Sequence, residues 1–185
     1  MGKLIYAFNV SLDGFIEGPD GKFDWAVPDP EVHRHFNELE KQIGTHLYGR
    51  RMWETMKVWQ TLDQQPDAAP EEVEFARAWR EAENLVFSRT LTSVDGNARL
   101  VRDDPVKMVA ELKAQSGKDI DVGGAGLASI FIKAGLVDEY RLYFYPVLVG
   151  SGKQMFQGIE APIRLKYLDT HPFVSGVTLV RYAPD

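Results

Sequence analysis

The alternation of short apolar runs with amphipathic runs constrains this chain most. Apolar, β-rich runs of strand length occur at residues 3–10, 45–49, 84–88, 98–101, 119–122 and 138–150. Between them, apolar residues recur at helical spacing in residues 30–43, 50–59, 71–83, 105–116 and 127–134. Strands that alternate with helices pair in parallel, because each crossover helix returns the chain to the same end of the sheet. The sequence therefore predicts a three-layer α/β fold with a mostly parallel central sheet.

The ends of these runs support the assignment. Asp29 and Asp104 each precede a proline, an order typical of a helix N-cap followed by the first helical position. The tail differs, because residues 163–173 and 176–184 are two strand-like runs joined by a turn, which predicts an antiparallel C-terminal hairpin. With 185 residues and 44% hydrophobic content, the chain is predicted to form a single domain over residues 1–185.

Composition excludes several classes of protein. The chain has no cysteine, which rules out disulfides, thiol nucleophiles and cysteine-ligated metals and fits a reducing cytoplasm. It shows neither a signal-peptide pattern nor an apolar run long enough to span a bilayer. The net charge of −6 disfavours nucleic-acid binding. His33 and His35 do not share a helix face and have no third ligand, so no metal site is expected.

The glycine-rich segment "VGGAGL", residues 122–127, lies between a strand-like run and a helix-like run. At such a junction a phosphate can approach bare backbone and bind the amides at the start of the helix. The segment does not match the G-x-G-x-x-G pattern, and a tight structural turn is the alternative explanation. Two further strand ends, "YGRRM" and "FSRTL", also carry anion-binding groups. Together the three ends suggest a dinucleotide with an additional phosphate.

The order of "NVSLDGFIEG", "LYGRRMWETM", "NLVFSRTL", "DVGGAGL" and "VDEYRLYFYPVLVGSGKQMF" resembles the dihydrofolate-reductase-like family. It is most similar to the branch of the RibD C-terminal domain, the reductase part of the riboflavin-biosynthesis deaminase–reductase. The resemblance covers nearly the whole chain. It implies an eight-stranded, mainly parallel sheet with an antiparallel C-terminal strand, NADPH as the cofactor, a small-molecule substrate and a homodimer.

The same resemblance assigns cofactor contacts at four places. The residues concerned are Ala7, Asn9, Gly49, Arg50, Arg51, Ser88, Arg89, Val122, Gly123, Gly124, Ala125, Gly126 and Leu127. Residues 7 and 9 would flank the nicotinamide, and the glycine loop would support the pyrophosphate. The pair Ser88 and Arg89 would contact the adenosine 2′-phosphate and favour NADPH over NADH. Met52 replaces a threonine common in relatives, which removes one hydroxyl contact to phosphate.

Fewer residues can be assigned to substrate binding and catalysis. Asp13 resembles the aspartate that faces the substrate in the riboflavin-type branch, although an aspartate before a glycine is also an ordinary turn. Glu31 lies near the place of the pterin-binding carboxylate of dihydrofolate reductases, although a first-turn glutamate also suits the helix dipole. Trp25 and Tyr143 are candidates for contact with the substrate, with core packing as the alternative.

These residues lead to an expected function. The chain is expected to be a cytoplasmic NADPH-dependent reductase of a small heterocyclic or sugar-imine substrate, like 5-amino-6-(5-phosphoribosylamino)uracil reductase. A true dihydrofolate reductase is a second hypothesis, weakened by the absence of a matching helix carboxylate. A dinucleotide-binding protein without turnover is a third. No motif in the sequence identifies the natural substrate.

Overall fold

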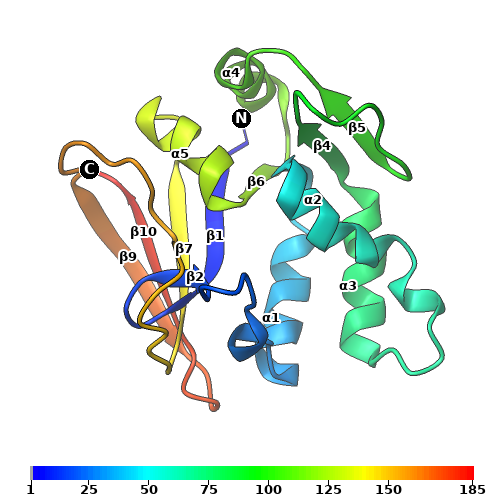
Figure 1. Cartoon of the computed structure of the whole chain (residues 1–185), viewed down its shortest axis with the longest axis vertical. Helices are drawn as coiled ribbons and strands as arrows, with labels where there is room; N and C mark the ends of the chain where they lie inside the picture. The colour runs from blue at the N-terminus through cyan, green and yellow to red at the C-terminus, as the bar shows by residue number, and fades with distance from the viewer. Residues whose placement is uncertain (1) are drawn as a thin grey trace.

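A computed structural model describes residues 2–185 as an eight-stranded sheet with helices on both sides (Figure 1). Across the sheet the strands follow the order β5-β4-β3-β6-β1-β7-β10-β9. Their bounds are β1 (Leu4–Ser11), β3 (Ile43–Gly49), β4 (Glu83–Phe87), β5 (Ala98–Val101), β6 (Asp119–Gly123), β7 (Glu139–Tyr145), β9 (Leu165–Pro172) and β10 (Thr178–Pro184). Strand β10 is antiparallel to β7 and β9, and every other pairing in this sheet is parallel. The predicted fold class is confirmed.

In the described part of the chain five α-helices connect these strands, and a second small sheet pairs β2 (Phe15–Glu17) with β8 (Lys153–Gln154). The helices are α1 (Pro30–Glu40), α2 (Arg50–Met56), α3 (Pro70–Glu81), α4 (Pro105–Gln115) and α5 (Ala125–Lys133). The carboxylates of Asp29 and Asp104 cap α1 and α4, each accepting hydrogen bonds from two backbone amides. Within residues 2–185, no helix combines the length and the apolar character needed to cross a membrane.

Two predicted elements end earlier than expected. The run at 138–150 forms a strand only to Tyr145, because Pro146 has no amide hydrogen with which to continue the ladder. The helix predicted to reach residue 59 ends at Met56 and tightens into a 3₁₀ turn over Lys57–Gln60. The polar segment after it, predicted as an exposed loop, contains a further 3₁₀ turn at Leu62–Gln64 before α3 begins.

Alternate residues of the strands pack against different layers. Leu4 and Tyr6 of β1 belong to the core beneath α4 and α5, which includes Phe131. The opposite face of the sheet buries Tyr143 against α1, where Val32 is fully buried. Helix α3 lies beside α1 on that second face (Figure 1). The sheet therefore forms the middle one of three layers.

Strands β1 and β6, which are neighbours near the centre of the sheet, separate toward their carboxyl ends. Strand β1 pairs with β6 only through Leu4 and Ile5, whereas it pairs with β7 from Ile5 to Ser11. Beyond the pair of Ile5 with Asp121, β1 and β6 separate, although β6 continues beside β3 to Gly123. In parallel α/β sheets ligands bind outside the carboxyl ends of the strands, where neighbouring strands part.

Candidate active site

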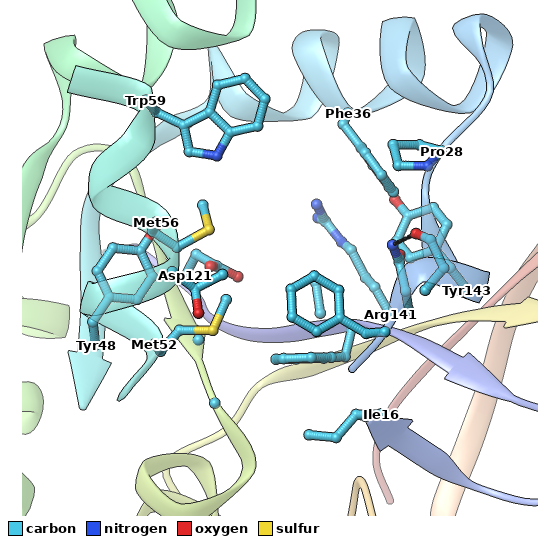
Figure 2. A pocket seen from close by; sticks show the side chains of 18 of the residues that line it. Ile16, Pro28, Phe36, Tyr48, Met52, Met56, Trp59, Asp121, Arg141 and Tyr143 are labelled. Atoms are coloured by element: carbon cyan, nitrogen blue, oxygen red, sulfur yellow. Dashed lines mark hydrogen bonds between the residues drawn. The ribbon is translucent and has the colours of Figure 1, made fainter. Parts of the chain in front are cut away.

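A cavity of about 890 Å³ lies where β1 and β6 separate. Its walls come from α1, from α2 with the turn that follows it, and from the junction of β6 with α5. The side chains of Phe36, Met56 and Trp59 project toward it and make much of its surface apolar (Figure 2). A cavity of this volume accommodates a ligand the size of a cofactor or a drug.

Glycines form one wall of this cavity. A Cβ added at Gly123 would lie 2.7 Å from the Tyr48 ring, so no side chain fits there. Gly124 has φ +96°, in the left-handed region that favours glycine. At Gly49 and Gly126 an added Cβ would have no heavy atom within 4 Å, so their backbone borders open space. This bare surface at the start of α5 fits the diphosphate of a nicotinamide dinucleotide, which requires close backbone approach and free amides.

The structure brings eight of the thirteen predicted cofactor residues into the cavity wall. These eight are Ala7, Asn9, Gly49, Arg51, Gly123, Gly124, Gly126 and Leu127. Met52, the position where a threonine was expected, lies in the wall beside them. The Asn9 side-chain amide donates a hydrogen bond of 3.0 Å to the carbonyl of Ala26, which fixes it at the edge of β1.

The remaining five predicted cofactor residues lie outside the wall. Val122 and Ala125 are buried in the core, and Arg50 is exposed at the start of α2. The Ser88 hydroxyl accepts hydrogen bonds from the amides of Thr90 and Leu91, and so stabilises the turn after β4. Arg89 is exposed in that same turn. A role for Ser88 and Arg89 in binding a cofactor phosphate therefore remains a prediction for a part of the ligand that extends beyond the cavity.

Two charged side chains enter the cavity from strands on either side of β1 (Figure 2). Asp121 of β6 pairs in register with Ile5, and Arg141 of β7 pairs with Ala7. The sequence reasoning missed both residues. One signal in the sequence could have identified them. Each is a charged residue between apolar neighbours in a strand expected to be buried on both faces, and a buried charge needs a partner.

His46 of β3 lies between two carboxylates behind the cavity. Its Nε2 is 2.6 Å from Oε1 of Glu40 and its Nδ1 is 3.6 Å from Oδ2 of Asp121. The first distance is a hydrogen bond and the second is a charge contact. The Tyr48 ring stacks on the imidazole at 5.5 Å between centroids. Burial alone lowers the pKa of His46, yet Glu40 and Asp121 outweigh it and raise the pKa to about 9.

This raised pKa predicts a pH-dependent stability. A histidine whose folded pKa exceeds its unfolded value of 6.5 stabilises the fold fully below pH 6.5, and this contribution is lost as the pH rises through about 9. Burial raises the pKa of the stacked Tyr48 well above its ordinary range, so that phenol stays neutral throughout. We expect the urea midpoint to fall between pH 6.5 and 9, and the fall to be smaller in His46→Gln. Asp121→Asn should move the fall to lower pH, and an identical pH profile in all three proteins would contradict the assignment.

The two predicted catalytic carboxylates do not line the cavity. Asp13 accepts hydrogen bonds from the amides of Val149 and Gly150 at 3.1 and 2.7 Å, which joins the loop after β1 to the loop after β7. A hydrogen bond from Ser11 and these two amides lower its pKa to about 2. Glu31 accepts a hydrogen bond of 3.0 Å from the amide of Val174. In this structure Asp13 joins two loops and Glu31 joins the start of α1 to the turn between β9 and β10, and neither side chain lines the cavity. A catalytic role for either carboxylate remains a prediction.

The two predicted substrate contacts differ in position. The indole of Trp25 packs edge to face against Tyr145, and it is not part of the cavity wall. Tyr143 does lie in the wall, and its buried hydroxyl has no hydrogen-bond partner within residues 2–185. Of the two, only Tyr143 is placed to meet a ligand.

The order of the strands, the antiparallel C-terminal pair and the glycine-lined opening beside β1 define a dihydrofolate-reductase-like fold. The family model of the RibD C-terminal domain matches residues 2–179, and the chain belongs to that family.

Known relatives agree with this assignment. YyaP of Bacillus subtilis (strain 168) is 38% identical over 181 residues, which cover 97% of this chain and 94% of YyaP. The crystal structure of a putative riboflavin biosynthesis protein from Shewanella sp. PV-4 superposes with a TM-score of 0.78 at 24% identity, over 99% of both chains. Dihydrofolate reductase from Enterococcus faecalis, solved with NADP(H) and RAB-propyl, gives a TM-score of 0.69 at 18% identity and covers 100% of this chain and 97% of that one.

Proposed function

We propose that this protein is an NADPH-dependent reductase that transfers a hydride to a small heterocyclic or sugar-imine substrate. One observation carries the proposal: glycine-lined ends of β3 and β6 meet at a cavity of about 890 Å³ that contains an opposed carboxylate and guanidinium. The bare backbone suits a dinucleotide, and the apolar remainder suits a small planar ring. Family membership supports the same class of reaction.

In this proposal the chain orients its ligands and controls a proton. A bound NADPH supplies the hydride. The backbone at Gly123 and Gly124 and the amides at the start of α5 hold the diphosphate, with Arg51 at the edge of the cavity. Phe36 and Trp59 exclude water from the reacting ring. Oδ1 and Oδ2 of Asp121 are the atoms assigned to hold or transfer a proton, in place of Asp13 and Glu31.

Dihydrofolate reduction is less well supported. That activity requires a free carboxylate on the first long helix, but the carboxylate of α1 in the cavity wall is Glu40, which is bonded to His46. Arg141 adds a positive charge to the same space and would repel a protonated pterin. A homodimer and a cytoplasmic location remain predictions from the resemblance.

Titration with NADPH and with NADH, followed by nicotinamide fluorescence, tests the cofactor assignment. We expect NADPH to bind more tightly than NADH, and Arg89→Ala to weaken NADPH by about ten- to a hundredfold, since a charge-assisted phosphate contact contributes about 1.5–3 kcal/mol. NADH binding should change little. Arg99→Ala is the matched control, because Arg99 is exposed on the adjacent β5 and pairs with Glu83.

The results distinguish the role of Arg89, the binding of the cofactor and the role of Asp121. Equal losses for NADPH and NADH would contradict the 2′-phosphate role of Arg89, and no binding of either cofactor would overturn the reductase proposal. For any substrate found in a screen of heterocycles, Asp121→Asn should retain NADPH binding and lose turnover. A fully active Asp121→Asn protein would remove Asp121 from the mechanism.

A further inference from the structure

Arg141 is a buried cation whose hydrogen-bonding capacity is largely unused. Its side chain is 7% exposed, and its Nε donates a hydrogen bond of 2.7 Å to Oε1 of Glu139. Its terminal nitrogens Nη1 and Nη2 make no hydrogen bond within residues 2–185, and the side chain projects into the cavity (Figure 2). The rest of the side chain is enclosed by protein, so these two nitrogens, which line the cavity, are the donors that Arg141 can offer to a ligand.

Glu139 does not neutralise Arg141 alone. The same buried carboxylate accepts hydrogen bonds from Lys3 at 3.2 Å and from Arg181 at 2.9 Å. Burial raises the pKa of Glu139, but the hydrogen bonds from these three cations outweigh burial and lower it. Arg181 has a second carboxylate, Asp169, at 2.8 Å, whereas Arg141 has none. Part of the positive charge of Arg141 is therefore available to a ligand.

A second unpartnered donor lies next to Arg141 on the same face of β7. The hydroxyl of Tyr143 is buried in the cavity wall without a partner. Burial raises the pKa of Tyr143, so the phenol keeps its proton and remains a donor. Phe36 packs edge to face on the Tyr143 ring at 4.7 Å between centroids and limits its movement. Two guanidinium nitrogens thus line one end of the cavity, the Tyr143 hydroxyl is buried in the wall beside them, and the acceptor Asp121 lies across β1 from them.

We propose that Arg141 and Tyr143 form the binding subsite for the carboxylate of a planar ring substrate. This inference rests on the proposed reductase function and narrows its substrate to an anionic ring compound. The two guanidinium nitrogens match the two oxygens of a carboxylate, and the tyrosine hydroxyl adds a third donor. The ring then lies over the small side chain of Ala7, between Arg141 and the proton-holding Asp121.

Other cations of the wall suit this role less well. Lys153 is 3.8 Å from Glu17 and already has a carboxylate partner. Arg51 is exposed on α2, beside the glycines assigned to the cofactor. Among the cavity-lining lysines and arginines, Arg141 alone is buried within residues 2–185. A largely buried cation distinguishes an anion from its neutral analogue more strongly than an exposed cation does, because less solvent screens its charge.

Ligand-observed NMR with matched probes tests the subsite. The probes are benzoate with benzamide and orotate with its amide, so each pair differs in charge at nearly constant shape. Each is titrated into the protein with and without saturating NADPH. We expect the carboxylate of at least one pair to bind at least tenfold more tightly than its amide. Arg141→Gln should abolish that preference, and Tyr143→Phe should reduce it several-fold.

Controls separate binding from folding. Arg181→Gln also removes a cation from Glu139, but Arg181 does not line the cavity, so the preference for carboxylates should remain. Tyr143→Phe leaves the Glu139 cluster unchanged and serves if Arg141→Gln does not fold. If NADPH binds but neither pair shows a preference for the carboxylate, or the preference survives both cavity variants, the subsite is overturned. If the preference depends on Arg141 while NADPH does not bind, the subsite stands and the reductase proposal fails.

Discussion

Gly123→Ala is expected to lower the free energy of unfolding by about 1–3 kcal/mol and to weaken NADPH binding. The new Cβ would lie 2.7 Å from Cε1 of Tyr48 and 3.0 Å from Cγ of Met52. The Tyr48 ring cannot easily move away, since it stacks on His46 and its hydroxyl accepts a hydrogen bond of 2.9 Å from Trp79. Urea unfolding and NADPH titration of the same preparation measure both effects.

Gly126→Ala is the matched control for this substitution. No heavy atom lies within 4 Å of an added Cβ at Gly126, which is in the first turn of α5. Alanine should stabilise the helix by about 0.5–1 kcal/mol, because glycine loses more backbone entropy there. Its methyl group would nevertheless occupy the open space assigned to the diphosphate, so NADPH binding should weaken. Unchanged NADPH affinity in both variants would show that the glycine wall does not hold the cofactor.

Glu139→Gln is the second substitution with a large expected effect. It leaves Lys3, Arg141 and Arg181 beside a neutral amide in a site where Glu139 is 1% exposed. Removing one partner of a buried ion pair typically costs about 3–5 kcal/mol. Here the cost falls on Arg141, which stays buried without its carboxylate, whereas Lys3 and Arg181 keep access to water. Thermal and urea unfolding at pH 7 should both report this loss.

Two comparisons test the origin of that loss. Asp169→Asn breaks the outer pair of Arg181, whose carboxylate partner is 53% exposed, and should cost less than about 1 kcal/mol. Combining Glu139→Gln with Arg181→Gln removes one repelling cation and should recover part of the stability. If Glu139→Gln were as stable as the parent protein, Arg141 would not be a buried cation that needs a carboxylate partner, which is the property on which the proposed subsite depends.

Much of the architecture could be predicted from local sequence. The alternation of strands and helices, the N-caps Asp29 and Asp104, each followed by a proline, and the C-terminal hairpin depend on short-range patterns, and the structure contains all of them. The sequence also predicts the glycine segment at a junction of strand and helix, which in the structure is the junction of β6 with α5. These features follow from properties of neighbouring residues, which a single sequence reveals.

The charged centre of the cavity could not be predicted in this way. Asp121 and Arg141 of the cavity, and His46 behind it, lie on three different strands, and only the strand order brings them to one face of the sheet. Asp13 is the converse case, because the sequence suggests a catalytic role that its contacts do not support. Its position after the first strand suggested catalysis, but its partners are amides at residues 149 and 150, which no local pattern indicates.

The position of β1 also governs how the protein forms. Strand β1 precedes its partners in the chain by more than a hundred residues, because β6 and β7 begin at residues 119 and 139. Its apolar residues must therefore remain unpaired in the sheet until residues 119–145 have also been synthesised, and pairing over such a separation slows folding. Because Ala7 of β1 forms part of the cavity wall, a ligand that depends on this wall would stabilise only the nearly complete fold. Such a ligand would bind after β1 has paired with β6 and β7, and would not assist the earlier steps of folding.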